Sequence, residues 1–235
     1  MRQVVLDTET TGLEPESGHR IIEIGCVEVI NRRRTERFFH QYLNPERDVE
    51  DGAYEVHGLS MEFLSEKPLF RDIAGDFVEF IRGSELIIHN APFDVAFINA
   101  ELARLGSEWG GVEDYCEVMD TLRLARELHP GQKNSLDALC ARYQVDNSNR
   151  DLHGALLDAG ILLDVYLAMT GGQVTLSLGD SITGGAGSEQ SASEIDRNRP
   201  ELRVIKPTSE EHQLHLKRLA DIDRESEGRC IWLQD

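Results

Sequence analysis

The sequence predicts a mixed α/β fold, in which a sheet carries helices on both faces, followed by a flexible linker and a small C-terminal docking segment. Three apolar, β-branched segments come before the first clear helix, and strand and helix signals alternate after them. Such alternation is typical of a sheet with helices on both faces. The chain changes in character at Gly171-Gly172, after which a polar stretch rich in Gly and Ser begins.

Five segments are expected to be strands because they are short, apolar and β-branched. The first lies at the start of the chain, and the second is a longer run of Ile and Val. The third is assigned from its alternating side chains. In chain order, the expected strands cover residues 3–7, 21–30, 37–43, 85–89 and a short segment at Val118.

Helices are expected where apolar side chains recur at helical spacing. Residues 70–81 have this spacing. Proline suits the first position of a helix, so Pro92 is expected to begin a helix that ends near Leu105. The remaining expected helices of this part lie near residues 120–128, near 135–143, and from about 155 to 169.

The last part of the chain is expected to form a small element of its own. Residues 202–206 have the pattern of a strand, and Thr208 with Glu211 matches a capping box, which predicts a helix to about residue 225. A segment of about 35 residues is too short to bury a core alone. The predicted organisation is a domain over residues 1–171, a linker over 172–200 and a docking segment over 201–235.

The composition is not that of a membrane protein or a disulfide scaffold. The 235 residues contain no apolar run long enough to span a bilayer, and Asp7 comes too early for a signal peptide. The four cysteines include no pair at CxxC spacing, so neither a zinc site nor a disulfide framework is indicated. Reduced thiols, a cytoplasmic location and no membrane contact are expected.

The formal net charge of −19 bears on the kind of partner. A protein that binds nucleic acid unaided usually carries a basic face. If this acidic chain acts on nucleic acid, metal ions at its site or a partner that delivers the strand must offset the charge. The alternative is that the charge only keeps the protein soluble.

Two carboxylates end the first expected strand. Asp7 and Glu9 are two residues apart, and alternation along a strand directs them to the same side. Clustered carboxylates repel one another unless a cation neutralises them, and Mg²⁺ or Mn²⁺ prefers oxygen ligands. A solvated strand end is the alternative explanation for this pair alone.

A third carboxylate, Asp94, follows a strand and a turn and is expected in the first turn of the next helix. The helix dipole favours an acidic side chain there without any catalytic role. Ligand sites in α/β sheets also gather at such strand ends. Both interpretations stay open for Asp94 taken alone.

His153 and Asp158 form the third group. A spacing of five on one helix would direct them roughly 140° apart, so they can converge only if His153 precedes the helix. Gly154 makes this plausible, because it can end a loop there. Asp158 lies in an otherwise apolar helix, and a buried carboxylate without a partner is costly. A cation or a hydrogen-bonding network around Asp158 is therefore expected.

Together these residues resemble the DnaQ-like family of exonucleases, in its subgroup with four acids and a histidine. Asp7 and Glu9 match the first motif of the family, Asp94 the second, and His153 with Asp158 the third. Each motif is weak alone, but the complete set is specific. The similarity covers almost the whole chain, including residues 5–12, 134–143, 152–158, 166–173 and 230–232.

This resemblance implies a ribonuclease-H-like fold and a 3′→5′ exonuclease that proofreads DNA synthesis with two divalent ions, Mg²⁺ or Mn²⁺. By analogy, Asp7 bridges both ions, Glu9 and Asp158 complete the first, and Asp94 holds the second. His153 is the implied general base that takes a proton from the attacking water. One alternative is a related exonuclease acting on RNA or short oligonucleotides. Another is a structural polymerase subunit that does not cut, against which the intact acid set argues.

Residues near the motifs are expected to contact the terminal nucleotide at the single-stranded 3′ end of DNA: Thr8, Thr11, Leu13, His57, Asn90 and Phe93. For Phe93, a place in the core is an equal alternative. Histidine and asparagine often occur in turns, so the alternative for His57 and Asn90 is a structural role in a turn.

The resemblance also implies partners. Residues 173–178 are similar to the clamp-binding hexapeptide of the family, with Gln173 for a polar pocket and Leu176 and Leu178 for an apolar one. The alternative is that the leucines finish the preceding helix. The family often carries a small theta-like subunit on the nuclease domain, and no residue here indicates its site.

The C-terminal segment is expected to dock on the alpha subunit, the catalytic subunit of the polymerase. It ends in Ile231, Trp232 and Leu233, which about 35 residues cannot bury within themselves. Exposed aromatic and aliphatic clusters usually mark interfaces. The alternative is a disordered tail with a chance apolar end.

Overall fold

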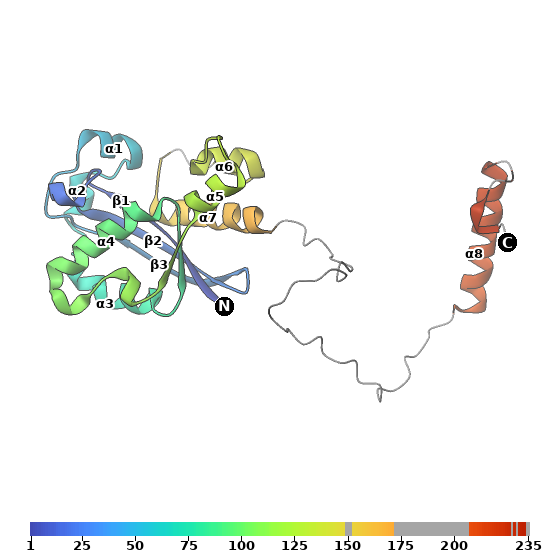
Figure 1. The fold of residues 1–235 in the computed structure, drawn as a ribbon, viewed down its shortest axis with the longest axis horizontal. Helices are drawn as coiled ribbons and strands as arrows, with labels where there is room; N and C mark the ends of the chain where they lie inside the picture. Colours follow the sequence, from blue (N-terminus) through green and yellow to red (C-terminus); the bar gives the residue numbers. More distant parts are fainter. Residues whose placement is uncertain (149–151, 172–206, 227, 229, 234–235) are drawn as a thin grey trace, which may run out of the picture. The chain divides into compact units, whose positions relative to one another are not determined.

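The computed structural model describes residues 1–148, 152–171, 207–226, 228 and 230–233, which fall into two separate units (Figure 1). The first unit is built on a five-stranded sheet with the strand order β3-β2-β1-β4-β5. Its strands are β1 (Arg2–Thr10), β2 (Ile21–Ile30), β3 (Arg33–Tyr42), β4 (Glu85–Ile88) and β5 (Glu117–Asp120).

The central strand, β1, extends beyond its parallel neighbour. β1 is antiparallel to β2 and parallel to β4, and β4 is parallel to β5. The ladder between β1 and β4 covers only Gln3, Val4 and Val5, whereas β1 continues to Thr10. The carboxyl ends of β1, β4 and β5 therefore meet at one edge of the sheet, where β1 projects farthest.

Helices connect and cover these strands. The longer ones in the first unit are α3 (Phe70–Ile81), α4 (Ala91–Leu105) and α7 (Ala155–Thr170). The shorter ones are η1 (Pro15–Ser17), α1 (Asp51–His57), α2 (Met61–Leu64), η2 (Ser107–Trp109), η3 (Val112–Asp114), α5 (Thr121–Leu128) and α6 (Leu136–Tyr143). None of the helices in the described ranges is long and apolar enough to cross a membrane.

Two hydrophobic clusters lie on opposite faces of the sheet. Val4 and Leu6 of β1 belong to one cluster with Phe77 of α3, whereas Val5 belongs to the other with Leu162 of α7. This division follows from the alternation of side chains along a strand. Full burial of one such large apolar side chain contributes about 1.5–3 kcal/mol to stability. The two clusters fix α4 and α7 against the sheet, and both helices carry predicted site residues.

The expected α/β architecture is confirmed, with differences at polar segments. β1 runs three residues past the expected end, to Thr10, and β3 begins four residues before the expected start, at Arg33. The start of β3 is Arg-Arg-Thr-Glu, and an edge strand that faces solvent needs no apolar pattern. α1 was not predicted, because His57 is its only buried residue and leaves no helical apolar period.

The second unit contains α8 (Ser209–Glu225) and η4 (Ile231–Leu233). The predicted capping box is present, since the Thr208 hydroxyl accepts from the Glu211 amide at 3.3 Å and the Glu211 carboxylate accepts from the Thr208 amide at 2.8 Å. α8 buries none of its residues, and Trp232 is 76% exposed. The expected strand at 202–206 and the expected linker at 172–200, with Gln173, Leu176 and Leu178, lie outside the described residues.

Candidate active site

The projecting end of β1 carries the first two carboxylates. Glu9 is buried and Asp7 is half-buried, and both line one cavity of about 790 Å³. Thr8, between them, donates a hydrogen bond from its hydroxyl to Asp94 Oδ1 at 2.7 Å. The cavity thus begins where β1 has lost its pairing with β4.

Asp94 reaches the same cavity from α4. It lies in the first turn of this helix, as predicted, and is only 3% exposed. Asn90 caps the helix in the left-handed conformation with φ 69°, and its amide donates to Asp120 Oδ1 at 3.1 Å. Burial raises the pKa of Asp94 to about 7, although the hydrogen bond from Thr8 opposes this shift. A buried acid with a pKa of about 7 is only about half ionised at neutral pH, and a nearby cation would stabilise its charged form.

Asp158 and His153 come from the start of α7. Asp158 is 2% exposed, and His153 lies on the loop before the helix, as its spacing required. The His153 amide donates to the Val56 carbonyl at 3.1 Å, and its Nδ1 is 3.3 Å from Asp158 Oδ2. The backbone contact with α1 and the contact with Asp158 together orient the imidazole toward the cavity.

Gly25 allows α7 to approach the sheet closely. Gly25 is the residue opposite Asp7 in the ladder between β1 and β2. A Cβ at this position would overlap the backbone of Ala155 and Leu156, so only glycine fits there. The first turn of α7, with Asp158, is therefore held next to the part of the sheet that carries Asp7.

These side chains have the chemistry of a cation site. Ligand atoms of Glu9, His153 and Asp158 all lie within 4.8 Å of one another. Carboxylate oxygens are the preferred ligands of Mg²⁺ and Mn²⁺, and a buried cluster of acids needs such a positive charge. All five predicted motif residues line the same cavity: Asp7, Glu9, Asp94, His153 and Asp158.

A second, more apolar cavity of about 350 Å³ shares residues with the first. Leu13 and Phe93 line both cavities, while Ala53, Val56 and His57 of α1 line only the second. Leu13 is 78% exposed, and Phe93 packs on Phe97 with ring centroids 5.0 Å apart. Phe93 thus belongs both to the edge of the core and to the cavity wall.

The other expected substrate contacts differ in their surroundings. Thr8 lines both cavities and Asn90 lines the first. His57 is buried beside the second cavity, its Nε2 makes no hydrogen bond with any described residue, and burial lowers its pKa. Thr11 lines neither cavity, because its buried hydroxyl contacts His19 Nδ1 at 3.1 Å. The structure therefore gives the Thr11 side chain a part in holding the loop after β1.

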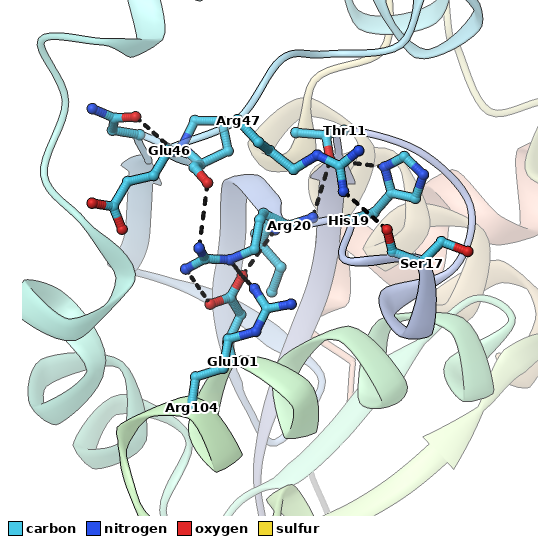
Figure 2. A network of polar contacts seen from close by, with 11 residues as sticks. Thr11, Ser17, His19, Arg20, Glu46, Arg47, Glu101 and Arg104 are labelled. Carbon is cyan, nitrogen blue, oxygen red and sulfur yellow. Dashed lines mark hydrogen bonds and ion pairs between the residues drawn. The ribbon is translucent and has the colours of Figure 1, made fainter.

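Figure 2 shows the polar network that holds this loop. The Arg20 guanidinium donates to both carboxylate oxygens of Glu101, at 2.6 and 2.8 Å, and the Arg20 amide donates to the Thr11 hydroxyl at 3.0 Å. His19 packs on Gly12, where a Cβ would overlap its ring. Glu101 belongs to α4, so the network ties the loop that carries Leu13 to the helix that carries Asp94.

Several residues of the larger cavity were not predicted as site residues. His89 lies there, with Nδ1 2.9 Å from the Thr121 hydroxyl. Others come from α5, α6 and the turn between them: Leu122, Arg126, Gln132, Asn134, Ser135, Leu136 and Asp137. The similarity of residues 134–143 to the exonuclease family was a signal for this region, but nothing in the local pattern indicates that α5 faces the carboxylates.

The family model RNase_T, described as an exonuclease, matches residues 4–166. The DNA polymerase III subunit epsilon of Escherichia coli (strain K12) is 49% identical over 98% of this chain and 97% of its own length. The same subunit of Pasteurella multocida (strain Pm70) is 48% identical over 98% and 93%. That of Rickettsia felis is 49% identical over 94% and 97%.

Solved structures show the same fold. Exonuclease X in complex with 5′ overhanging duplex DNA aligns with a TM-score of 0.54 and 28% identity, over 72% of this chain and 93% of that chain. The nuclease domain of 3′hExo, a DEDDh family member bound to rAMP, aligns with a TM-score of 0.60, over 72% and 90%. Its identity is 18%, so this second likeness concerns the fold alone.

Proposed function

The chain belongs to the exonuclease family and, within it, to the epsilon subunits of DNA polymerase III, and from this we propose that its larger cavity is a two-metal active site. The family membership makes it a 3′→5′ exonuclease that removes mispaired nucleotides during DNA synthesis and depends on divalent metal. What carries the assignment of the site is the convergence of four acids and a histidine from β1, α4 and α7 on one cavity.

We assign each residue a role in the reaction. Asp7 would contact both ions, Glu9 and Asp158 the first and Asp94 the second. Two ions, Mg²⁺ or Mn²⁺, held by these residues would supply a strong nucleophile and stabilise the leaving oxygen. His153, oriented by Asp158, would take the proton of the attacking water. The products are a 5′-mononucleotide and a strand shortened by one residue.

The apolar cavity is proposed to take the terminal nucleotide. Ala53, Val56 and Leu13 offer a surface for a base, and Phe93 lines both this cavity and the one with the carboxylates. The His57 Nε2 is a buried polar atom that a base or sugar could satisfy. Thr8 and Asn90 would complete the contacts at the rim.

The direct test compares the purified chain on single-stranded DNA and on RNA of the same sequence, with Mg²⁺ and with Mn²⁺. We expect release of 5′-mononucleotides from the 3′ end of DNA. Faster hydrolysis of RNA would favour the alternative of an RNA or oligonucleotide exonuclease. No hydrolysis of either would favour a structural subunit.

The site assignment is tested with Asp7→Ala, which should abolish cleavage without unfolding the protein, because it removes one member of a repelling cluster. Asp76→Ala is the matched control, since Asp76 is an exposed carboxylate of α3 outside both cavities. Wild-type turnover in a folded Asp7→Ala variant contradicts the assignment.

Residues 173–178 are proposed to bind the sliding clamp. The support is the sequence Gln-Val-Thr-Leu-Ser-Leu, which resembles the clamp-binding hexapeptide of the family. Gln173→Ala combined with Leu176→Ala should weaken clamp binding, and Leu178 would share the apolar pocket. Unchanged clamp affinity of the double variant contradicts this proposal.

The segment 201–235 is proposed to dock on the DNA polymerase III alpha subunit, with residues 172–200 as the linker to the nuclease domain, 1–171. The support is the exposure of Ile231 and Trp232 beside an α8 that buries nothing. Leu233 continues the same apolar end. A partner that holds the DNA would explain how a chain of charge −19 serves a polyanionic substrate.

Two further parts of the proposal concern the surroundings of the protein. A theta-like subunit, which the family often carries, would bind the nuclease domain. A cytoplasmic location agrees with the four cysteines, all of which are free thiols.

A further inference from the structure

The larger cavity has an uneven distribution of charge. Of its lining residues in the described ranges, Arg126 alone is a lysine or arginine. The carboxylates that line the cavity are Asp7, Glu9, Asp94, Asp137 and Asp158. A nucleic acid strand in this cavity therefore meets one guanidinium and five carboxylates among its described lining residues.

Arg126 is available for a ligand. It lies in the last turn of α5, is exposed, and makes no hydrogen bond or ion pair with any residue in the described part of the chain. Leu122, four residues earlier, also lines the cavity, so this face of α5 is turned toward it. Arg123, on another face, is paired with Glu127 at 3.4 Å and does not line the cavity.

The phosphates of the substrate are candidate ligands for the Arg126 guanidinium. In the proposed site, the phosphate that is cut would lie among the clustered acids, where divalent ions would offset the negative charge. The next phosphate toward the 5′ end would have no such ions beside it, and the carboxylates of the cavity would repel it. A guanidinium binds a phosphate through two parallel hydrogen bonds, which suits this position.

We propose that Arg126 binds the phosphate next to the scissile one and so positions the strand for cleavage. The inference rests on the proposed function of the cavity. It makes Arg126 a substrate-binding residue whose effect depends on the number of phosphates in the substrate. A substrate that has only the scissile phosphate does not engage Arg126.

Two short substrates separate these cases. The dinucleoside monophosphate TpT contains only the scissile phosphate, whereas TpTpT also contains the next one. We expect Arg126→Gln to lower kcat/KM on TpTpT by about three- to ten-fold, mainly through KM, and to leave TpT unchanged. On a longer oligothymidylate, the slope of log(kcat/KM) against log salt should become shallower by about 0.7, the value for one lost contact to a single strand.

Two further variants complete the experiment. Arg123→Gln removes the same charge from the same helix outside the cavity and should behave as wild type on all substrates. Arg126→Lys keeps a positive charge without the paired donors and should recover part of the loss on TpTpT. Equal effects of Arg126→Gln on TpT and TpTpT, or none on either, would overturn the inference. Failure of the wild type to cut any DNA substrate would instead overturn the proposed function, and this inference with it.

Discussion

Gly25 lies against the backbone of Leu156, so close that a side-chain carbon on Gly25 would overlap it. This contact between β2 and α7 sets the distance between two catalytic candidates. Asp7 is opposite Gly25 in the ladder, and Asp158 lies two residues after Leu156. The geometry of the site thus depends on a residue that has no side chain to contribute.

Gly25→Ala should separate α7 from the sheet and move Asp158 away from Asp7. We expect kcat/KM to fall by at least about 100-fold, since misplacement of about 1 Å can have this effect. The free energy of unfolding should fall by about 1–3 kcal/mol because of overpacking. Gly160→Ala is the control, because a Cβ there would only reach ordinary contact with Arg34 at 3.7 Å. Equal effects of the two substitutions in kinetics and urea unfolding would contradict the role of Gly25.

Asp94 should make the stability of the metal-free protein depend on pH. Its pKa is about 7 in the folded protein and 3.8 ordinarily. The folded state therefore binds more protons between these values, and its free energy of unfolding falls as pH rises from about 4 to about 7. Asp94→Asn should remove this fall and raise the melting temperature in EDTA at pH 8. Asp76→Asn should not, and the result is checked by melting curves at pH 5 and pH 8.

Added Mn²⁺ should stabilise the wild type more at pH 8 than at pH 5, because Asp94 must lose its proton to serve as a ligand. Equal stabilisation at both pH values would argue against Asp94 as a ligand.

His153→Ala should lower turnover by about 10²–10⁴-fold, the usual contribution of a general base. Titration with Mn²⁺ should still show binding, because the carboxylates remain. The low-pH limb of the rate profile should change as well, since the group that must be deprotonated is gone. A variant that keeps both the wild-type rate and the wild-type profile would show that another base acts.

Glu101→Gln should destabilise the protein by about 3–5 kcal/mol, because it leaves Arg20 without its charged partner in a partly buried position. Glu127→Gln, at an exposed ion pair, should change stability by less than about 1 kcal/mol. The loop with Leu13 should also become less ordered, which proteolysis would detect as new cleavage between residues 12 and 19. Identical stability of the two variants would mean that the network in Figure 2 does not restrain the loop.

Truncation after Leu178 should leave hydrolysis of short single strands nearly unchanged, because all five motif residues precede it. The same truncation should abolish co-purification with the polymerase alpha subunit. Trp232→Ala in the full chain provides a milder test of the same contact and should weaken it. Full affinity of the truncated chain for the polymerase, measured without clamp, would contradict the docking proposal.

The sequence predicts the position of an element or side chain where the residues follow a regular spacing. The spacing over 70–81 gave α3 with the bounds it has in the structure, and the spacing of His153 and Asp158 required a loop before α7. Asp7 and Glu9 could be placed on one side because strand alternation is strict. These predictions depend on local geometry, which neighbouring residues determine.

What the sequence did not reveal depends on contacts between distant segments. Arg126 and His89 line the cavity only because β4 and β5 end at the same edge as β1. Thr11 is expected to contact the terminal nucleotide, and the sequence did not show that its hydroxyl contacts His19 and accepts from the Arg20 amide. The close approach of α7 at Gly25 could not be predicted either, because a glycine in a strand does not show which helix will cross it.

The exposed C-terminal unit has a consequence for the amount of protein in a cell. α8 buries none of its side chains, and helices with few buried apolar contacts open readily and are cut by proteases. On the docking proposal, molecules without the polymerase partner on this unit should lose it and keep only the first unit. The number of intact chains would then follow the supply of the partner rather than the rate of synthesis. Proofreading capacity would in this way stay matched to the number of polymerases.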